Sequence, residues 1–139
     1  MSKRVKINPE LFAYASILER IARIRVKDTF ESGETIYFVL YPGCLRKALG
    51  KNGENVKRLQ EKFGKKIRLL EFNMDCKRFV RNFIYPLKVE EITEGEDGDI
   101  LIKESSKKTK SLLIGRDARN LNLLNLAVSR FFNKEVKIL

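Results

Sequence analysis

A short segment at residues 50–53 combines residue types that suit contact with phosphate groups, because it reads Gly-Lys-Asn-Gly. Glycine lets another backbone approach closely, since no Cβ atom stands in the way. Lys51 adds a positive charge inside the loop. A helix that begins after Gly53 would direct its free amides and the positive end of its dipole toward the same anion. The spacing therefore predicts a contact for the phosphate backbone of a nucleic acid.

Basic residues beside this loop extend the candidate contact. Lys57 and Arg58 lie on the side of the following helix that faces away from its apolar stripe. Lys66 and Arg68 continue the positive charge into the next strand. Any one of them could be an ordinary solvated side chain, but their clustering favours phosphate binding. The candidate nucleic-acid-contacting residues are Leu49, Gly50, Lys51, Asn52, Gly53, Val56, Lys57, Arg58, Lys66 and Arg68.

A second segment repeats this pattern 65 residues later. Residues 48–56 align with residues 113–121, so that Gly50 pairs with Gly115 and Lys51 with Arg116. Because the same order of predicted elements surrounds both loops, we infer an internal duplication.

The second loop departs from the first at two positions. Asp117 places a carboxylate where a phosphate would approach, and Ala118 adds a methyl group where the first loop has a glycine. Basic residues on either side offset this acid in part. We therefore expect a weaker nucleic-acid contact here, made by Ile114, Gly115, Arg116, Asp117, Ala118 and Arg119.

Hydrophobic periodicity predicts the same order of elements around each loop: helix, strand, strand, helix, loop, helix, strand. In the first half, Asn8 is the expected N-cap and Gly64 the expected C-terminal cap of helices. The expected elements there are a helix at 9–22, strands at 23–27 and 35–41, helices at 45–49 and 54–63, and a strand at 65–72. In the second half they are a helix between Asp75 and Pro86, strands at 87–92 and 100–103, an apolar segment at 112–114, a helix to Phe132 and a strand at 135–139.

The overall charge also favours a polyanionic partner. The 139 residues include 29 Lys and Arg against 18 Asp and Glu, a formal net charge of +11. This excess attracts polyanions and speeds their encounter with the protein. Residues 1–74 carry a net charge of +8 and residues 75–139 a net charge of +3. We expect two domains with these bounds, of which the first is the stronger nucleic-acid contact.

Other classes of function lack the residues they need. The chain has no histidine, and Cys44 and Cys76 lie far apart, so neither a general base of the usual kind nor a zinc site is indicated. No apolar run reaches the length that spans a membrane. Two isolated cysteines are typical of the reducing cytoplasm. We therefore expect a cytoplasmic binding protein without a cofactor or metal, and not an enzyme.

The two loop segments and the element order resemble a known family. Residues 48–59 read Ala-Leu-Gly-Lys-Asn-Gly-Glu-Asn-Val-Lys-Arg-Leu, and residues 113–121 read Leu-Ile-Gly-Arg-Asp-Ala-Arg-Asn-Leu. A Gly-x-x-Gly loop between helices is typical of KH domains, and the pair resembles the archaeal NusA-like transcription factors. This resemblance implies an α+β fold of two tandem type II KH domains (α-β-β-α-α-β), each a small three-stranded sheet covered by helices on one face. It also implies binding of single-stranded RNA during transcription elongation, termination or antitermination.

Two other interpretations stay open. The same fold could serve in ribosome assembly or rRNA processing. Alternatively, the chain could be mainly a protein-binding module that docks on RNA polymerase or another transcription factor through its Leu-rich helix at 121–132. The duplicated loop and its basic neighbours favour RNA, whereas the altered second loop leaves room for a protein partner.

Overall fold

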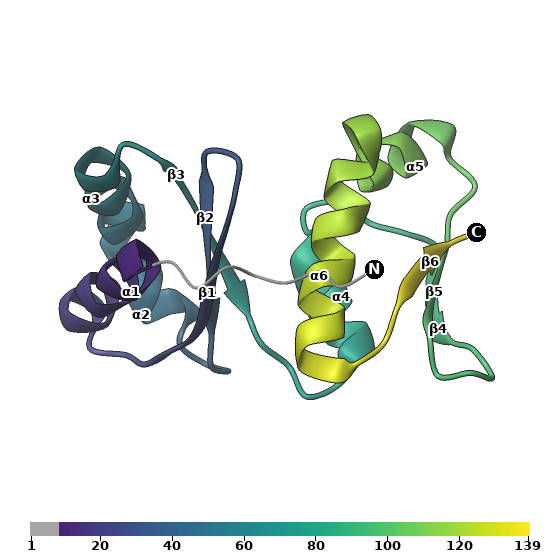
Figure 1. Cartoon of the computed structure of the whole chain (residues 1–139), viewed down its shortest axis with the longest axis horizontal. Helices are drawn as coiled ribbons and strands as arrows, with labels where there is room; N and C mark the ends of the chain where they lie inside the picture. The colour runs from purple at the N-terminus through teal and green to yellow at the C-terminus, as the bar shows by residue number, and fades with distance from the viewer. Residues whose placement is uncertain (1–8) are drawn as a thin grey trace. The chain divides into compact units, whose positions relative to one another are not determined.

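The computed structural model describes residues 9–139 and shows an α+β protein (Figure 1). The chain forms two compact units, which divide between Asn73 and Met74. Each unit contains a three-stranded sheet and the same order of helices and strands. The two units are described separately below.

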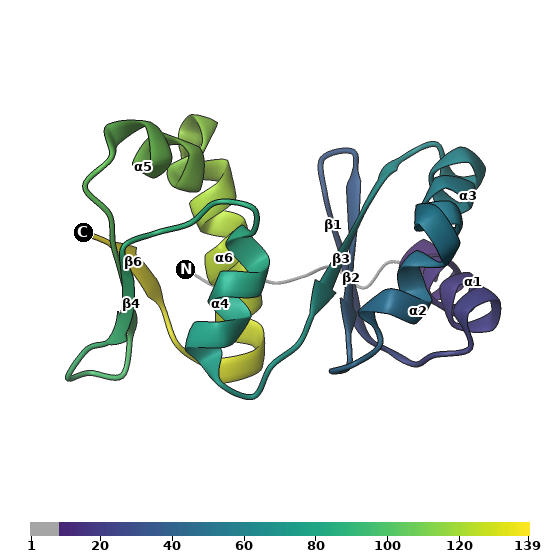
Figure 2. The ribbon, with the colours of Figure 1, turned by 180° about the vertical axis from the view of Figure 1, so that it is seen from behind.

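The first unit follows the predicted order of elements. Its elements are α1 (Pro9–Ala22), β1 (Val26–Ser32), β2 (Thr35–Leu40), α2 (Leu45–Leu49), a single 3-10 turn η1 (Lys51–Gly53), α3 (Glu54–Phe63) and β3 (Lys66–Glu71). Strand β2 lies in the centre of the sheet, antiparallel to β1 and parallel to β3. The three helices cover one face of this sheet, as Figure 2 shows from behind.

The core of the first unit lies between that sheet face and the helices. Alternate residues of β2 point into it, because side chains along a strand alternate between the two faces. Ile67 and Leu69 of β3 pack against the same core. The fully or nearly fully buried members of this core are Leu11, Leu18, Ile36, Phe38, Leu40, Ala48 and Leu59.

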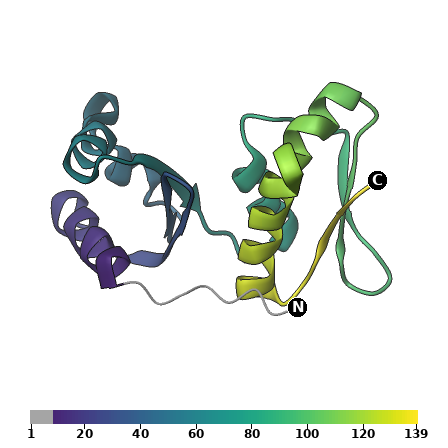
Figure 3. The ribbon, with the colours of Figure 1, turned by 45° about the horizontal axis from the view of Figure 1, so that its top comes forward.

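The second unit repeats this arrangement. Its elements are α4 (Cys76–Ile84), β4 (Glu91–Glu94), β5 (Ile100–Lys103), α5 (Lys107–Ile114), η2 (Arg116–Ala118), α6 (Arg119–Phe132) and β6 (Val136–Ile138). Strand β5 is central, antiparallel to β4 and parallel to β6. Helices α4 and α6 lie on the same side of the sheet (Figure 3), and Phe79 of α4 contacts the rings of Phe131 and Phe132.

Helix α6 uses its apolar side chains for packing. Leu123, Leu124, Ala127 and Val128 are all buried. The buried amide of Asn125 donates to the carbonyl oxygen of Val136 and accepts from its N–H, at 3.2 and 2.6 Å. These two bonds hold α6 against β6. They also satisfy the buried side-chain amide of Asn125.

Helix ends follow the predicted capping residues where the structure describes them. Asp75 accepts a hydrogen bond from the N–H of Lys77 at the start of α4. Gly64 ends α3 with φ 65°, in the left-handed region that glycine adopts without a Cβ penalty. The expected cap at Asn8 lies outside the described residues.

Two predicted strand starts are wrong. Strand β1 begins at Val26 and not at residue 23, because Arg23 has φ 56° and the N–H of Ile24 still bonds to the carbonyl oxygen of Glu19. Strand β4 begins at Glu91 and not at residue 87. The N–H of Glu90 bonds to the carboxylate of Glu104 instead of a strand partner.

Helix α5 is longer than the apolar segment predicted before the second loop. It begins at Lys107, and Ser106 caps it by accepting a hydrogen bond from the N–H of Thr109 at 3.2 Å. The first turn is polar and rich in lysine, so apolar periodicity gives no sign of it.

Across residues 9–139, none of the helices combines the length and apolar character that crossing a bilayer requires.

Candidate nucleic-acid interface

The first glycine loop is a tight reversal between helices α2 and α3. Gly50 has φ 74° and ψ 176°, a conformation that is essentially restricted to glycine. Asn52 and Gly53 follow with φ 56° and 71°, both left-handed. The N–H of Gly53 donates to the carbonyl oxygen of Gly50 at 3.2 Å. The loop therefore has a defined backbone, and glycine is required at its first position.

Asn55 fixes the first loop from inside. Its amide donates to the carbonyl oxygen of Lys47 at 3.2 Å, which ties the first turn of α3 back to α2. A Cβ atom added to Gly50 would lie 2.7 Å from Cγ of this asparagine. Glycine is thus required at this position for two reasons: it adopts the backbone conformation, and it leaves room for the side chain of Asn55.

The second loop repeats this backbone residue for residue. Gly115 has φ 74° and ψ 173°, and Asp117 has φ 55° and ψ 32°, against φ 56° and ψ 28° at Asn52. Asn120 donates to the carbonyl oxygen of Leu112 at 2.9 Å, as Asn55 does in the first loop. The duplication therefore extends to the geometry of the loop and to the bond that holds it.

The last loop position distinguishes the two copies. A Cβ atom on Gly53 would meet no protein atom within 4 Å, so the space beside this glycine is open. Ala118 occupies the same place in the second loop with φ 57° and ψ 24°. The fold therefore tolerates a methyl group here, and the glycine of the first loop leaves that space free for a ligand.

Side chains of the first loop are available to an anion. Lys51, Asn52, Lys57 and Arg58 are all exposed. Among residues 9–139, none of the three cations in this set forms an ion pair. Leu49 is 38% exposed just before the loop, and Val56 is partly buried just after it, so apolar surface adjoins the charge.

Three lysines, each before or within the last strand of its unit, form ion pairs instead. Lys65 forms an ion pair with Glu31, and Lys134 lies 2.6 Å from Glu94. Lys137 lies 3.3 Å from the carboxylate of Asp99. Hydrogen bonds to these carboxylates are the largest cause of a raised pKa at each of the three lysines. Lys51, Lys57 and Arg58 at the first glycine loop, in contrast, have no carboxylate partner among the described residues.

The structure does not bring Lys66 and Arg68 to the loop. They alternate along β3 with Ile67 and Leu69, which point into the core under the helices. Lys66 and Arg68 therefore lie on the other face of the sheet. Arg68 is opposite Tyr37 in the ladder, and burial lowers the pKa of its guanidinium. The predicted set thus divides into a group at the loop and two residues away from it.

Residues of the second loop keep their positions but carry different chemistry. Arg116, Asp117 and Arg119 are exposed, and Ile114, Gly115 and Ala118 are partly buried. The carboxylate of Asp117 stands at the position of the Asn52 amide in the matching backbone. Residues 115–123 carry two cations and one acid, whereas residues 50–58 carry three cations and one acid, so the net attraction for a phosphate is smaller than at the first loop.

The candidate residue list omitted Asn55 and Asn120. Neither has to touch a ligand, because each acts by holding its loop against the preceding helix. The repeat could have identified them, because an asparagine recurs five residues after the first glycine in both copies.

Comparison with known proteins identifies relatives along most of the chain. No family model matches it. The "Probable transcription termination protein NusA" of Methanococcus vannielii is 33% identical over 121 residues, which cover 86% of this chain and 70% of the relative. The protein of the same name from Methanocaldococcus jannaschii is 31% identical, over 85% of this chain and 66% of the relative. The one from Thermoplasma acidophilum is 31% identical over 132 residues, 93% of this chain and 91% of the relative.

A solved structure shares the fold of this chain. The crystal structure of APE1850 superposes with a TM-score of 0.74 and 26% sequence identity, over 96% of this chain and all of that one. The sequence resemblance to archaeal NusA-like factors is therefore confirmed. Since relatives more than 30% identical are matched over 70% and 91% of their lengths, the chain belongs to the family of archaeal NusA-like proteins.

Proposed function

We propose that this protein binds single-stranded RNA through two tandem type II KH domains, at 1–74 and 75–139, as a NusA-like transcription factor. It acts on nascent RNA during elongation, termination or antitermination, and it is a binding protein rather than an enzyme. The observation that carries the proposal is the first loop: a fixed glycine backbone with open space at Gly53, surrounded by exposed cations that have no carboxylate partner among the described residues. The family supports the transcriptional role, because its members are named as probable termination proteins.

The loop geometry matches what binding of a sugar–phosphate backbone requires. KH domains hold about four nucleotides against a Gly-x-x-Gly loop. At Gly53 the RNA backbone can approach without meeting a Cβ atom. Lys51 then provides a charge in the loop, and Lys57 and Arg58 extend that charge along α3. The exposed side of Leu49 offers an apolar surface on which bases can pack.

RNA polymerase or another transcription factor is a further candidate partner. The chain spans 70% and 66% of the lengths of the two methanogen relatives, so the activity of those whole proteins extends to it only as a proposal. A role in ribosome assembly remains the alternative for the same RNA-binding surface. Crosslinking in cells separates the two, since the first role predicts nascent transcripts and the second predicts ribosomal precursors.

A titration of fluorescent single-stranded RNA tests the proposal. We expect the wild-type protein to bind, with an affinity that falls steeply as salt rises because phosphate contacts release counterions. Lys51→Asp with Asn52→Asp places two carboxylates in the loop and is expected to weaken binding at least tenfold. Circular dichroism of the variant should match that of the wild type, because both side chains are exposed.

Lys88→Asp with Asn133→Asp is the matched control. It makes the same chemical changes at two exposed positions outside both loops, so RNA affinity should change less than twofold. Equal affinities of the wild type and the loop variant for RNA would refute the assignment of the first loop. A loss of the same size in the control would show that only overall charge matters.

A further inference from the structure

The helix before the second loop has an additional basic turn. At the offset of 65 residues, Lys107 and Lys108 of α5 correspond to Pro42 and Gly43 before α2. In the first unit this segment is a turn, in which the N–H of Cys44 bonds to the carbonyl oxygen of Tyr41 at 3.2 Å. In the second unit the same positions are helical. The two copies therefore differ in the segment before the loop, which is a turn in the first unit and the start of a helix in the second.

Two carboxylates near this turn accept hydrogen bonds from backbone N–H groups. Glu104 is 8% exposed, and its two oxygens accept hydrogen bonds from the N–H groups of Glu90 and Ser106, each at 3.0 Å. Glu90 in turn accepts hydrogen bonds from the N–H and hydroxyl of Ser105. These bonds order the backbone before α5 and occupy Glu104, the acid nearest to it in sequence, together with Glu90.

The lysines of the first turn remain available. Lys107 and Lys108 are exposed and form no ion pair with any residue that the structure describes. Leu112 lies four residues after Lys108, so the two share one helix face, and it is 48% exposed. This face leads along α5 to the loop, where Arg116 and Arg119 are also exposed.

We infer that the exposed face of α5 is a second contact for the RNA backbone, in which Lys107 and Lys108 bind phosphates and Leu112 packs against a base. This inference rests on the proposed function and assigns its site in the second unit. In the first unit, exposed cations without an ion pair among the described residues lie on both sides of the loop, at Arg46 and Lys47 on α2 and at Lys57 and Arg58 on α3. In the second unit Lys107 and Lys108 lie farther from the glycine, in the first turn of α5. Lys107 and Lys108 add positive charge to the second unit at a place away from Asp117, whose carboxylate weakens the attraction of the loop for phosphate.

The test uses the full chain and RNAs of two lengths, about four and about twenty nucleotides. The short RNA fills one KH footprint and is expected to occupy the stronger first loop. Lys107→Glu with Lys108→Glu should then leave its affinity within twofold of wild type. With the long RNA the same variant should bind about fivefold more weakly. Its slope of log affinity against log salt should fall by about one to two units, because up to two phosphate contacts are lost.

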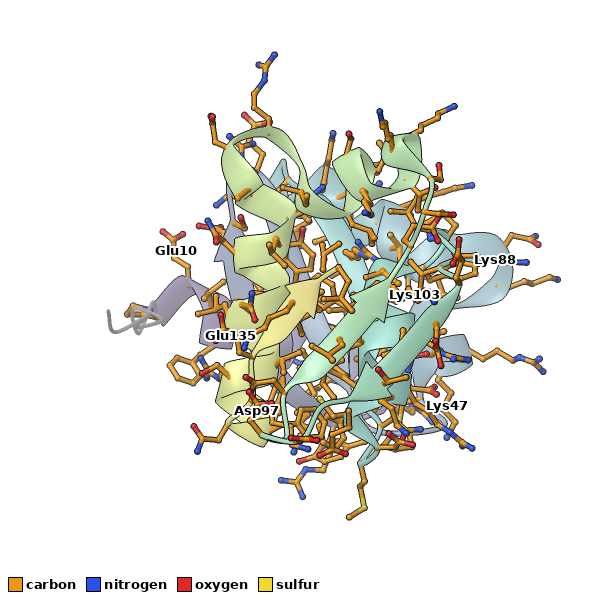
Figure 4. The ribbon with its side chains drawn as sticks, turned by 90° about the vertical axis from the view of Figure 1, so that its right-hand side faces the viewer. Glu10, Lys47, Lys88, Asp97, Lys103 and Glu135 are labelled. Carbon is orange, nitrogen blue, oxygen red and sulfur yellow. The ribbon has the colours of Figure 1, made fainter. Side chains whose placement is uncertain are left out.

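Lys88→Glu with Lys103→Glu is the matched control. It makes the same change in charge at two exposed lysines of the same unit. Figure 4 labels both, with Lys103 on the face of the β4–β6 sheet that no helix covers. The control should bind the long RNA within twofold of wild type. Lys107→Gln with Lys108→Gln, which removes charge without reversing it, should show a smaller loss in the same direction.

Four outcomes would overturn the inference. Unchanged affinity of the α5 variant for the long RNA would exclude a contact at α5, while a loss caused by the first-loop variant would still uphold RNA binding. Equal losses on both RNA lengths would place the lysines in the first contact and not in a second one. Equal losses in the α5 variant and the control would assign the effect to net charge. If the wild type bound neither RNA, the proposed function would fail as well.

Discussion

The two glycine loops of this protein have the same backbone but different chemistry. Their dihedral angles agree within a few degrees at the first glycine and at Asn52 and Asp117, and an asparagine amide holds each loop to the preceding helix. They differ in the side chains that meet a ligand. The first ends in a glycine with open space beside it, and the second in an alanine preceded by an acid.

This difference separates the residues that fix the backbone of the loop from those that can contact a ligand. The first glycine and the asparagine recur in both copies, because the glycine makes room for the asparagine and the asparagine ties the loop to the preceding helix. The residues between them vary, since they point outward and the fold does not depend on them. A change at the shaping residues should therefore alter stability, and a change at the outward residues should alter binding.

The largest expected effect is on stability. Gly50→Ala should lower the free energy of unfolding of its unit by about 2–4 kcal/mol, because the backbone at φ 74° and ψ 176° disfavours a Cβ atom that would also collide with Asn55. Gly115→Ala should cost a similar amount in the second unit. Urea denaturation followed by amide signals of each unit measures both changes.

Gly53→Ala is the control for these two variants. Its Cβ atom would meet open space, so only the left-handed backbone opposes it, at a cost of about 1 kcal/mol. If Gly53→Ala destabilised its unit as much as Gly50→Ala, the distinction between shaping and outward positions would be lost.

The next effect concerns the two groups of basic residues in the first unit. Lys57→Glu with Arg58→Glu should weaken binding of single-stranded RNA about tenfold, or about 1.4 kcal/mol, because these side chains lie beside the loop. Lys66→Glu with Arg68→Gln should change the affinity about twofold or less, since both residues lie on the other sheet face. Fluorescence anisotropy gives both values. A larger loss in the strand variant would put the RNA across the sheet instead of along the helices.

The smallest expected effect is a gain. Asp117→Asn with Ala118→Gly gives the second loop two residues of the first without altering its backbone, and should raise affinity for long single-stranded RNA about threefold as the acid is removed. The reciprocal change, Asn52→Asp with Gly53→Ala, should weaken binding by more than that factor. No gain from the first exchange would mean that the second loop does not face the RNA.

Sequence patterns predicted the order of elements and both loops, because these depend on local chemistry. Glycine spacing and apolar periodicity mark the reversal and its helices, and Gly64 and Asp75 mark helix ends. The start of α5 was missed because its cap and lysines carry no apolar period. The first residues of β1 were misassigned because Arg23 has a left-handed backbone and the N–H of Ile24 bonds to the carbonyl oxygen of Glu19. Those of β4 were misassigned because the carboxylate of Glu104 binds the N–H of Glu90.

The sequence predicted the candidate site correctly only for residues that directly follow the loop along the chain. Lys51, Lys57 and Arg58 follow the loop directly, and the structure places them around it. Lys66 and Arg68 are near in sequence, but the alternation of β3 turns them to the other sheet face. The sequence shows that Lys66 and Arg68 alternate with Ile67 and Leu69. It does not show which sheet face the helices cover, and this decides on which face the two basic residues lie. The roles of Asn55 and Asn120 required the hydrogen bonds themselves.

The central claim is that the first loop is the stronger RNA contact, and amide NMR during a titration with single-stranded RNA tests it most directly. Both loops have matching backbones, so their amides report binding on the same scale. We predict that the signals of residues 50–54 shift at lower RNA concentration than those of residues 115–119. Shifts that begin at the second loop, or that spare the first, would contradict the account.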